Sequence, residues 1–191
     1  METYISKKQL RKKLLSYRRL LSKEEFSKRN NLLISKVENY LQDYRPQKIH
    51  LFLSIKRNQE PNILKLANSF WSKNIQIVVS KTDFLSEQMK HYMLTENTIL
   101  EESSKGIPEP KNAKETSIVD LDIFFVPLLM SDREGYRIGY GGGYYDRLLK
   151  ETKAVKVGLS LSSPVDKIVQ REDWDMHLDY LITPFKIYHY G

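Results

Sequence analysis

The chain has 191 residues, a formal net charge of +7 and no cysteine. This length fits one domain of ordinary size, and an apolar fraction of 40% excludes a disordered chain. Without cysteine, a disulfide scaffold, a thiolate zinc site and a cysteine nucleophile are also excluded. The longest apolar run, residues 123–130, is far too short for a membrane-spanning helix.

The excess positive charge lies at the amino end. Residues 1–30 contain ten basic and three acidic side chains, whereas the charges of the remaining residues balance. Such a block suits a polyanionic partner, such as a nucleic acid, an anionic membrane or a phosphorylated ligand, and it equally suits a solvated helix face. A mitochondrial transit peptide is another interpretation. A secretory signal is not expected, because no apolar stretch follows the charges.

Two helices are predicted at this end. Ser6 is a candidate N-cap, and apolar residues recur at steps of three and four from Leu10 to Leu21. Ser22, followed three residues later by Glu25, has the pattern of a capping box. It predicts a second helix that extends to about Leu41.

Strands and helices alternate after Pro46. Residues 49–55 and 75–79 are predicted strands, joined by a helix that begins at Pro61. Further strands are predicted at residues 89–94, 123–129, 155–161 and 178–183, with a polar connection at 101–116 and a helix at 143–150.

This order predicts an α/β fold with a mostly parallel sheet and helices on both faces, in a Rossmann-like three-layer architecture. No internal repeat or linker divides the sequence. We therefore expect a single domain over residues 1–191, in which residues 1–44 form a basic helical arm that packs on the sheet domain.

The densest motif is the segment 137–147, in which four glycines stand within five residues after the most apolar predicted strand. Ligands of α/β sheets collect at the carboxyl ends of strands, and glycines let the backbone turn several amide groups toward an anion. Tyr144 stands where a dinucleotide motif needs its third glycine, and the Lys-Ser/Thr pair of a P-loop is missing. A flexible turn would not need three consecutive glycines, so we interpret the segment as an anion-binding loop.

Several charged residues suggest a metal and a phosphate chain. Asp146 falls in the first turn of the helix after the glycines, where a carboxylate beside phosphates requires a bridging cation such as Mg²⁺. By itself it would only complement the helix dipole. The acidic cluster at 172–179 either supplies a second carboxylate or forms a solvated turn. Lys7 and Arg11 share one helix face and could grip phosphates.

With these motifs, the sequence resembles the 5-formyltetrahydrofolate cyclo-ligase family, also called 5,10-methenyltetrahydrofolate synthetases. The resemblance covers nearly the whole chain. Two positions depart from the family pattern: some members carry a basic residue where Gly142 stands, and many carry a glutamate where this chain has Pro184. The matching segments are Lys7 to Arg11, Phe52 to Ile55 with Glu60 and Pro61, Arg137 to Asp146, and Trp174 to Thr183.

The resemblance implies an enzyme of one-carbon metabolism. It would use ATP and Mg²⁺ to convert 5-formyltetrahydrofolate into 5,10-methenyltetrahydrofolate, ADP and phosphate, through a phosphorylated formyl (imidate phosphate) intermediate. Such chemistry requires positioning and charge stabilisation rather than a covalent nucleophile, and no catalytic triad is visible. We expect a cytoplasmic monomer that binds small substrates but neither nucleic acid nor membrane.

The same resemblance assigns site residues by their place in the motifs. The pterin would stack on tyrosines, and Glu60 would accept hydrogen bonds from its N–H groups. Mg²⁺ would bind Asp146 and Asp175. ATP would contact Lys7, Lys8, Gln9, Leu10, Arg11, Arg137, Ile138, Gly139, Tyr140, Gly141, Gly142, Gly143, Tyr144 and Tyr145. The folate would contact Arg11, Ile55, Glu60, Tyr140, Gly141, Gly142, Gly143 and Tyr144.

Two alternative functions remain. The first is a non-enzymatic nucleic-acid-binding module that uses the basic arm, which would leave the glycine loop and Asp146 without a role. The second is a Rossmann-type dehydrogenase, which the missing third glycine disfavours.

Overall fold

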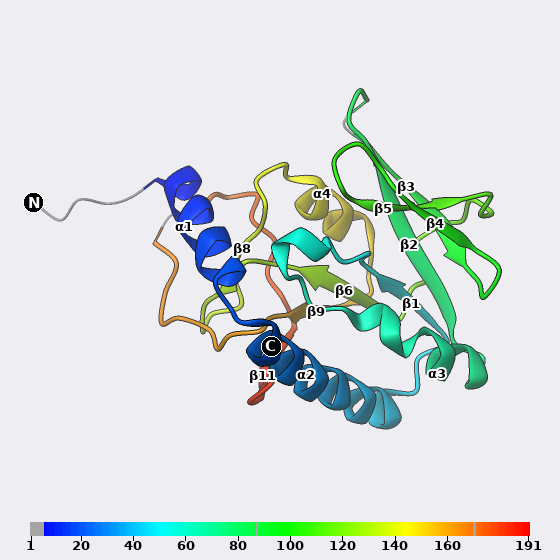
Figure 1. Ribbon diagram of the computed structural model, residues 1–191, viewed down its shortest axis with the longest axis horizontal. Helices are drawn as coiled ribbons and strands as arrows, with labels where there is room; N and C mark the ends of the chain where they lie inside the picture. The colour runs from blue at the N-terminus through cyan, green and yellow to red at the C-terminus, as the bar shows by residue number, and fades with distance from the viewer. Residues whose placement is uncertain (1–5, 87, 170) are drawn as a thin grey trace, which may run out of the picture.

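A seven-stranded sheet forms the centre of the computed structural model, which describes residues 6–86, 88–169 and 171–191 (Figure 1). The strand order is β11-β10-β9-β6-β1-β2-β3. The strands from β10 to β2 pair in parallel, and β3 and β11 add antiparallel edges. The predicted mostly parallel sheet is therefore confirmed. The strands are β1 (Lys48–Leu51), β2 (Gln76–Asp83), β3 (Gln88–Leu94), β6 (Ile123–Pro127), β9 (Val155–Leu159), β10 (Tyr180–Ile182) and β11 (Ile187–His189).

The parallel strands create one topological switch point. From β1 the chain proceeds to β2 on one side, and it later continues through β6, β9 and β10 on the other side. The connections on the two sides of β1 therefore diverge at the carboxyl ends of β1 and β6, where α/β sheets form ligand-binding crevices.

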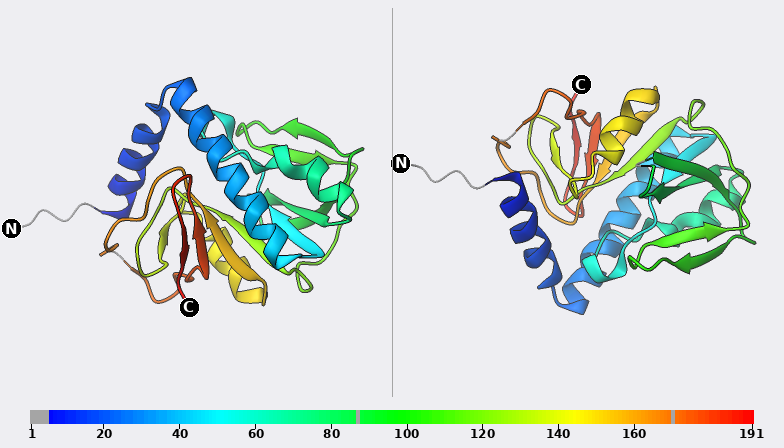
Figure 2. Two further views of the ribbon diagram at one scale, coloured as in Figure 1. Left: turned by 90° about the horizontal axis from the view of Figure 1, so that it is seen from below. Right: turned by 90° about the horizontal axis from the view of Figure 1, so that it is seen from above.

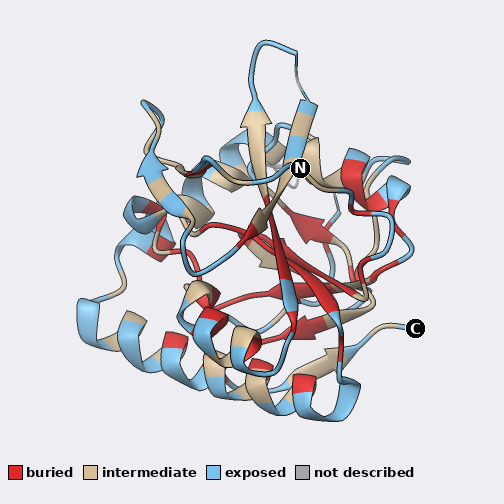
Figure 3. Ribbon diagram, turned by 90° about the vertical axis from the view of Figure 1, so that its right-hand side faces the viewer, coloured by how far each residue is buried: buried red, intermediate tan, exposed pale blue. Residues whose placement is uncertain are grey.

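Helices cover both faces of the sheet, as predicted (Figure 2). On one face, α2 (Lys23–Tyr44), the 3₁₀ turn η2 (Ile63–Leu66) and α3 (Ala67–Ser72) pack on the sheet. The other face is covered by α4 (Tyr144–Glu151). Alternate residues of a strand serve the two faces: in β6, Phe125 packs toward α2 and Phe124 toward α4. Figure 3 shows the buried positions concentrated on the central strands and on the inner side of α2.

The first helix, α1 (Lys7–Arg19), lies apart from both layers. Ser6 caps it, and Gln9 completes a reciprocal capping box. Its apolar side, with Leu10 and Leu14, packs against a small separate cluster of Leu129, Ile138 and Ile168. Leu129 comes shortly after the end of β6, and Ile138 lies in the hairpin that follows it, so α1 lies over the carboxyl end of the sheet. The hairpin of β7 (Met130–Ser131) and β8 (Arg137–Ile138) forms the surface beneath it.

Several local predictions need correction. The polar connection at 101–116 contains a hairpin of β4 (Ile99–Glu102) and β5 (Pro108–Lys111), which the sequence hides because these strands have little apolar alternation. The first strand ends at Leu51 rather than Ile55, and the helix expected from Pro61 begins as the 3₁₀ turn η2. Ser22 caps α2, but the Glu25 carboxylate pairs with Arg29 instead of completing the capping box.

No helix among the described residues is long and apolar enough to cross a bilayer.

Candidate functional site

The glycine loop runs from β8 to α4 at the carboxyl end of the sheet (Figure 1). Gly141 and Gly143 have positive φ angles of 102° and 66°, which side chains rarely tolerate. A Cβ atom at Gly142 would lie 2.5 Å from the Tyr144 ring, so that ring packs directly on the glycine backbone. Each of the three consecutive glycines therefore has a structural reason. Gly143 directly precedes α4, and the helix adds the positive end of its dipole to the loop.

Two arginines of α1 hold this loop. Arg11 Nε donates to the carbonyl of Gly139 at 3.1 Å, and its guanidinium lies against Gly141. Arg18 is buried, and it donates to the Tyr140 hydroxyl at 3.2 Å and to the carbonyl of Leu128, which follows β6. Part of the basic block is thus built into the site rather than solvated.

Glu60 joins the loop from the switch-point side of the sheet. Its carboxylate is 4% exposed and accepts a hydrogen bond from the Ile55 amide at 2.7 Å. Burial raises the pKa of Glu60, and hydrogen bonds from Ile55 and the Tyr140 phenol partly oppose this rise. Burial and the neighbouring Glu60 charge likewise raise the pKa of Tyr140. Ile55, Glu60 and Tyr140, which the resemblance assigns to the folate, therefore lie together.

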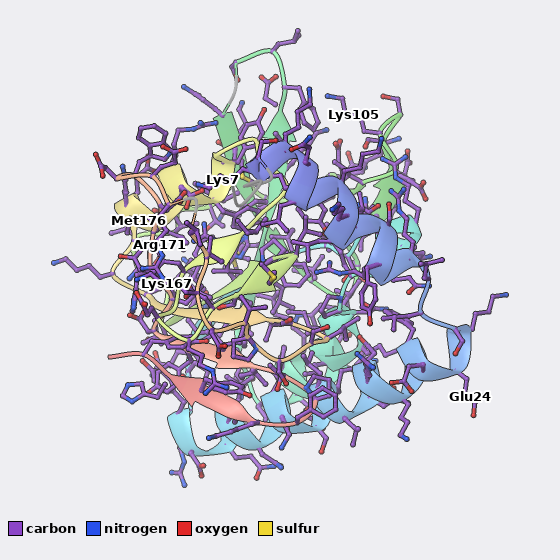
Figure 4. The ribbon with its side chains drawn as sticks, turned by 90° about the vertical axis from the view of Figure 1, so that its left-hand side faces the viewer. Lys7, Glu24, Lys105, Lys167, Arg171 and Met176 are labelled. Atoms are coloured by element: carbon purple, nitrogen blue, oxygen red, sulfur yellow. The ribbon has the colours of Figure 1, made fainter. Side chains whose placement is uncertain are left out.

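The two predicted metal carboxylates gather around Arg137, whose side chain is 4% exposed. Arg137 donates to Asp146 Oδ1 at 2.7 Å and to the Met176 carbonyl at 2.6 Å. Lys7 Nζ lies 2.7 Å from Asp175 Oδ2. Burial lowers the pKa of Arg137, whereas the charges of Asp146 and Asp175 both raise it, so both acids act on the same guanidinium. Figure 4 shows Lys7 and Met176 on neighbouring segments of this region.

These carboxylates fit a magnesium ion that takes few ligands from the protein. Among residues 6–86, 88–169 and 171–191, no group of three or more acidic or histidine side chains could hold a metal alone. Asp146 and Asp175 each engage one oxygen in an ion pair. Mg²⁺ bound to nucleotides commonly uses one or two carboxylates and completes its shell with phosphates and water. The donor set therefore suits Mg²⁺ with a bound nucleotide.

Other residues assigned by the resemblance occupy supporting places. Lys8 is exposed, and the Gln9 side chain caps α1. Leu10 and Ile138 belong to the small apolar cluster under α1. Tyr145 turns toward the sheet, where its ring contacts Phe124 and His50 edge-on. Leu10, Ile138 and Tyr145 therefore pack within the protein around the loop, whereas Lys8 and Gln9 are exposed.

Sequence reasoning missed Arg18 and Asn58. Asn58 is buried and accepts a hydrogen bond from Arg19 at 2.6 Å, so it ties the end of α1 to the segment before Glu60. Arg18 lies seven residues after Arg11, which places both on one helix face. That spacing could have identified Arg18, whereas no local pattern marks Asn58.

Comparisons with known proteins identify the family. A family model described as the 5-formyltetrahydrofolate cyclo-ligase family matches residues 4–184. The 5-formyltetrahydrofolate cyclo-ligase of Haemophilus influenzae is 31% identical over 149 residues, which cover 73% of this chain and 77% of that protein. The enzyme of that name from Mus musculus is 27% identical over 190 residues and 93% of each chain.

Two solved structures have the same fold. The 5,10-methenyltetrahydrofolate synthetase of Aquifex aeolicus has a TM-score of 0.83 and 31% identity, with 97% of this chain and 93% of that chain covered. The synthetase of Mycoplasma pneumoniae has a TM-score of 0.77 at 23% identity, over 94% and 99% of the two chains. At that identity, the second likeness concerns the fold alone.

Proposed function

The chain belongs to the 5-formyltetrahydrofolate cyclo-ligase family, and on that premise we propose that it closes 5-formyltetrahydrofolate to 5,10-methenyltetrahydrofolate with ATP and Mg²⁺. The observation that carries this proposal is the meeting of Arg11, Glu60 and the glycine loop at the carboxyl end of the sheet. One side of this meeting point is cationic and carries the backbone amides of the glycine loop, which suits phosphates. The other side is a buried carboxylate among tyrosines, which suits a pterin.

The nucleotide side would bind the phosphates of ATP. The amides of the glycine loop and the amino end of α4 attract anions. Lys7 can exchange its Asp175 partner for a phosphate, which would release that carboxylate. Asp146 and Asp175 would then hold Mg²⁺, which neutralises charge on the transferred phosphoryl group. Arg137, held between Asp146 and the Met176 carbonyl, fixes the orientation of the first carboxylate.

The folate side would bind the pterin. The Glu60 carboxylate accepts hydrogen bonds from the Ile55 amide and the Tyr140 phenol, and the lone pairs that remain would accept N–H groups of the ligand. The exposed Tyr140 ring would offer a face for stacking, whereas the Tyr144 ring packs on Gly142 and lies beneath the Arg147 guanidinium. Arg18 holds the Tyr140 hydroxyl, so the position of this wall depends on α1.

The reaction then needs positioning more than side-chain chemistry. The formyl oxygen attacks the γ-phosphorus and ADP leaves, which gives an imidate phosphate. N10 attacks the activated carbon, loses its proton, and phosphate leaves with the former formyl oxygen. Fixed cations that face the transferred group lower the barrier without a covalent enzyme intermediate.

The direct test is formation of the methenyl chromophore from 5-formyltetrahydrofolate after addition of ATP and Mg²⁺. Product that lacks the formyl oxygen, with ¹⁸O from a labelled formyl group recovered in phosphate, supports the intermediate. No chromophore in the complete mixture refutes the activity.

A binding measurement separates this function from the alternatives. Mg-ATP should raise the melting temperature, whereas NAD should not. At a hundredfold excess over Kd, bound ligand adds about 2.7 kcal/mol to the free energy of unfolding. Stabilisation by NAD alone would favour a dehydrogenase. Tight, steeply salt-dependent binding of random DNA would favour the nucleic-acid module instead.

A further inference from the structure

A buried carboxylate that the proposed function does not use lies at the base of the β7–β8 hairpin. Asp132 directly follows β7, and its side chain is fully buried. A buried charge is costly unless hydrogen bonds or an ionic partner compensate it. Asp132 has both kinds of partner, and they come from separate parts of the chain.

The two carboxylate oxygens of Asp132 face different segments. Oδ1 accepts hydrogen bonds from the backbone amides of Glu134 at 3.0 Å and Tyr136 at 2.9 Å, in the turn of its own hairpin. Oδ2 accepts hydrogen bonds from the Ile168 amide at 3.0 Å and from the Arg171 guanidinium at 2.6 Å. Asp132 thereby ties the hairpin to the chain that follows β9.

The chain that follows β9 depends on polar anchors, because little of it is buried. Val165 and Val169 are 37% and 64% exposed, whereas Ile168 is 3% exposed. The Val165 amide donates to the carbonyl of Ser131 at 2.9 Å, and the Ile168 amide donates to Asp132. The second of these anchors uses a side chain, so a substitution can remove it without altering the backbone.

Residues 165–169 support the first helix, and we call them the α1 seat. Their buried member, Ile168, belongs to the small cluster on which the apolar side of α1 packs. The same helix carries Lys7 and Arg11, and Figure 4 shows Lys7 and Arg171 on the same side of the molecule. A displaced seat would therefore move both cations relative to the glycine loop.

We propose that Asp132 is a positioning residue for the nucleotide side of the site. Its carboxylate holds the α1 seat at a fixed spacing from the hairpin that carries Arg137, so that Lys7 and Arg11 face the glycine loop before ATP binds. This inference rests on the proposed function. Groups that are already in place bind a ligand without the cost of ordering them, so this spacing should set the ATP KM rather than kcat.

Asp132→Asn tests the proposal, because an amide offers one acceptor oxygen and its NH₂ group must face one pair of donors. The hairpin amides lie in the same turn as residue 132, so we expect the oxygen to keep them and the NH₂ group to face Ile168 and Arg171. The ATP KM should rise about tenfold, which corresponds to about 1.4 kcal/mol. We expect kcat and the folate KM to stay near their wild-type values.

Asp166→Asn is the matched control. Asp166 pairs with Arg133 at 3.0 Å and so joins the same two segments, but its side chain is 93% exposed. The loss of this exposed pair should leave the ATP KM unchanged. In the Asp132→Asn background, Lys7→Ala should raise the ATP KM by a smaller factor than in the wild type, because the cation is already displaced. The same factor in both backgrounds, or a lower kcat with an unchanged ATP KM, overturns the proposal.

Hydrogen exchange of the ligand-free protein gives a readout that needs no activity. The amides of α1 should exchange faster in Asp132→Asn than in wild type, while those of β1 and β6 keep their protection. Unchanged exchange in α1, or equal acceleration in α1 and the sheet, overturns the proposal. The proposed function fails separately, when the wild-type enzyme makes no methenyl product, and the exchange test still applies.

A second variant serves if Asp132→Asn does not fold. Arg171→Gln removes one of the two donors to Asp132 Oδ2 and leaves the Ile168 amide in place. It should show the same pattern of ATP KM and α1 exchange with smaller changes. Wild-type values of both quantities in Arg171→Gln overturn the proposal.

Discussion

Asp146→Asn would remove the carboxylate that forms an ion pair with the Arg137 guanidinium, and we expect a measurable loss of stability. Loss of one partner of a fully buried ion pair costs about 3–5 kcal/mol. The Arg137 side chain is 4% exposed but that of Asp146 is 24% exposed, and Arg137 keeps its bond to Met176. The smaller range for a hydrogen bond to a charged group, about 1.5–3 kcal/mol, therefore applies. In a chain of this size, that loss lowers Tm by about 3–12 °C.

Thermal unfolding of the ligand-free protein is the assay. Asp173→Asn is the matched control, because Asp173 is an exposed acid of the neighbouring loop. In a double-mutant cycle, Asp146→Asn combined with Arg137→Met should cost clearly less than the sum of the single changes. A Tm equal to that of wild type would refute the ion-pair argument. A metal role has its own readout: the stabilisation by Mg-ATP should shrink in Asp146→Asn, and an unchanged shift would refute it.

Three further changes probe other parts of the molecule. Lys7→Ala should raise the ATP KM several-fold and Lys12→Ala should not, since Lys7 is the one of these two lysines that pairs with Asp175. Equal effects on the ATP KM in steady-state kinetics would mean that the arm acts only through its overall positive charge. Arg18→Met should raise the folate KM more than the ATP KM, and Tyr140→Phe in that background should add little to the folate KM. Additive increases in the folate KM would show that the two residues act independently. Burial lowers the pKa of His50 to about 3. Because an unfolded histidine titrates near 6.5, the unfolded chain binds one more proton between these values, so stability should rise with pH by up to about 1.4 kcal/mol per unit. Urea unfolding at about pH 4 to 6 should show a flatter dependence in His50→Gln; an unchanged slope would contradict this assignment.

Short apolar runs that alternate with helical segments predicted the parallel core, because strands buried on both faces are apolar along their length. The residues of β6 are all apolar and buried, and those of β9 are apolar or small apart from Lys156. The β4–β5 hairpin escaped prediction, since its residues are largely exposed and it turns at Gly106 without a strong local signal. Short edge strands of this kind depend on tertiary contacts rather than on periodicity.

The candidate site likewise contains residues that the sequence could identify and residues that it could not. Its glycine loop could be identified locally, because Gly141, Gly142 and Gly143 each meet a local backbone or packing requirement. The partners of Asp146 and Asp175 could not, since Arg137 and Lys7 reach them only after folding.

The anchoring of α1 has a consequence for how activity is lost. This helix is packed on a small apolar cluster that is separate from the two large cores of the sheet. Segments with few buried contacts open at a lower free energy than the core does. Release of α1 would withdraw Lys7, Arg11 and Arg18 together, while the sheet stays folded. Heat inactivation should therefore precede global melting, and a nucleotide that bridges α1 and the glycine loop should narrow the interval between the two transitions.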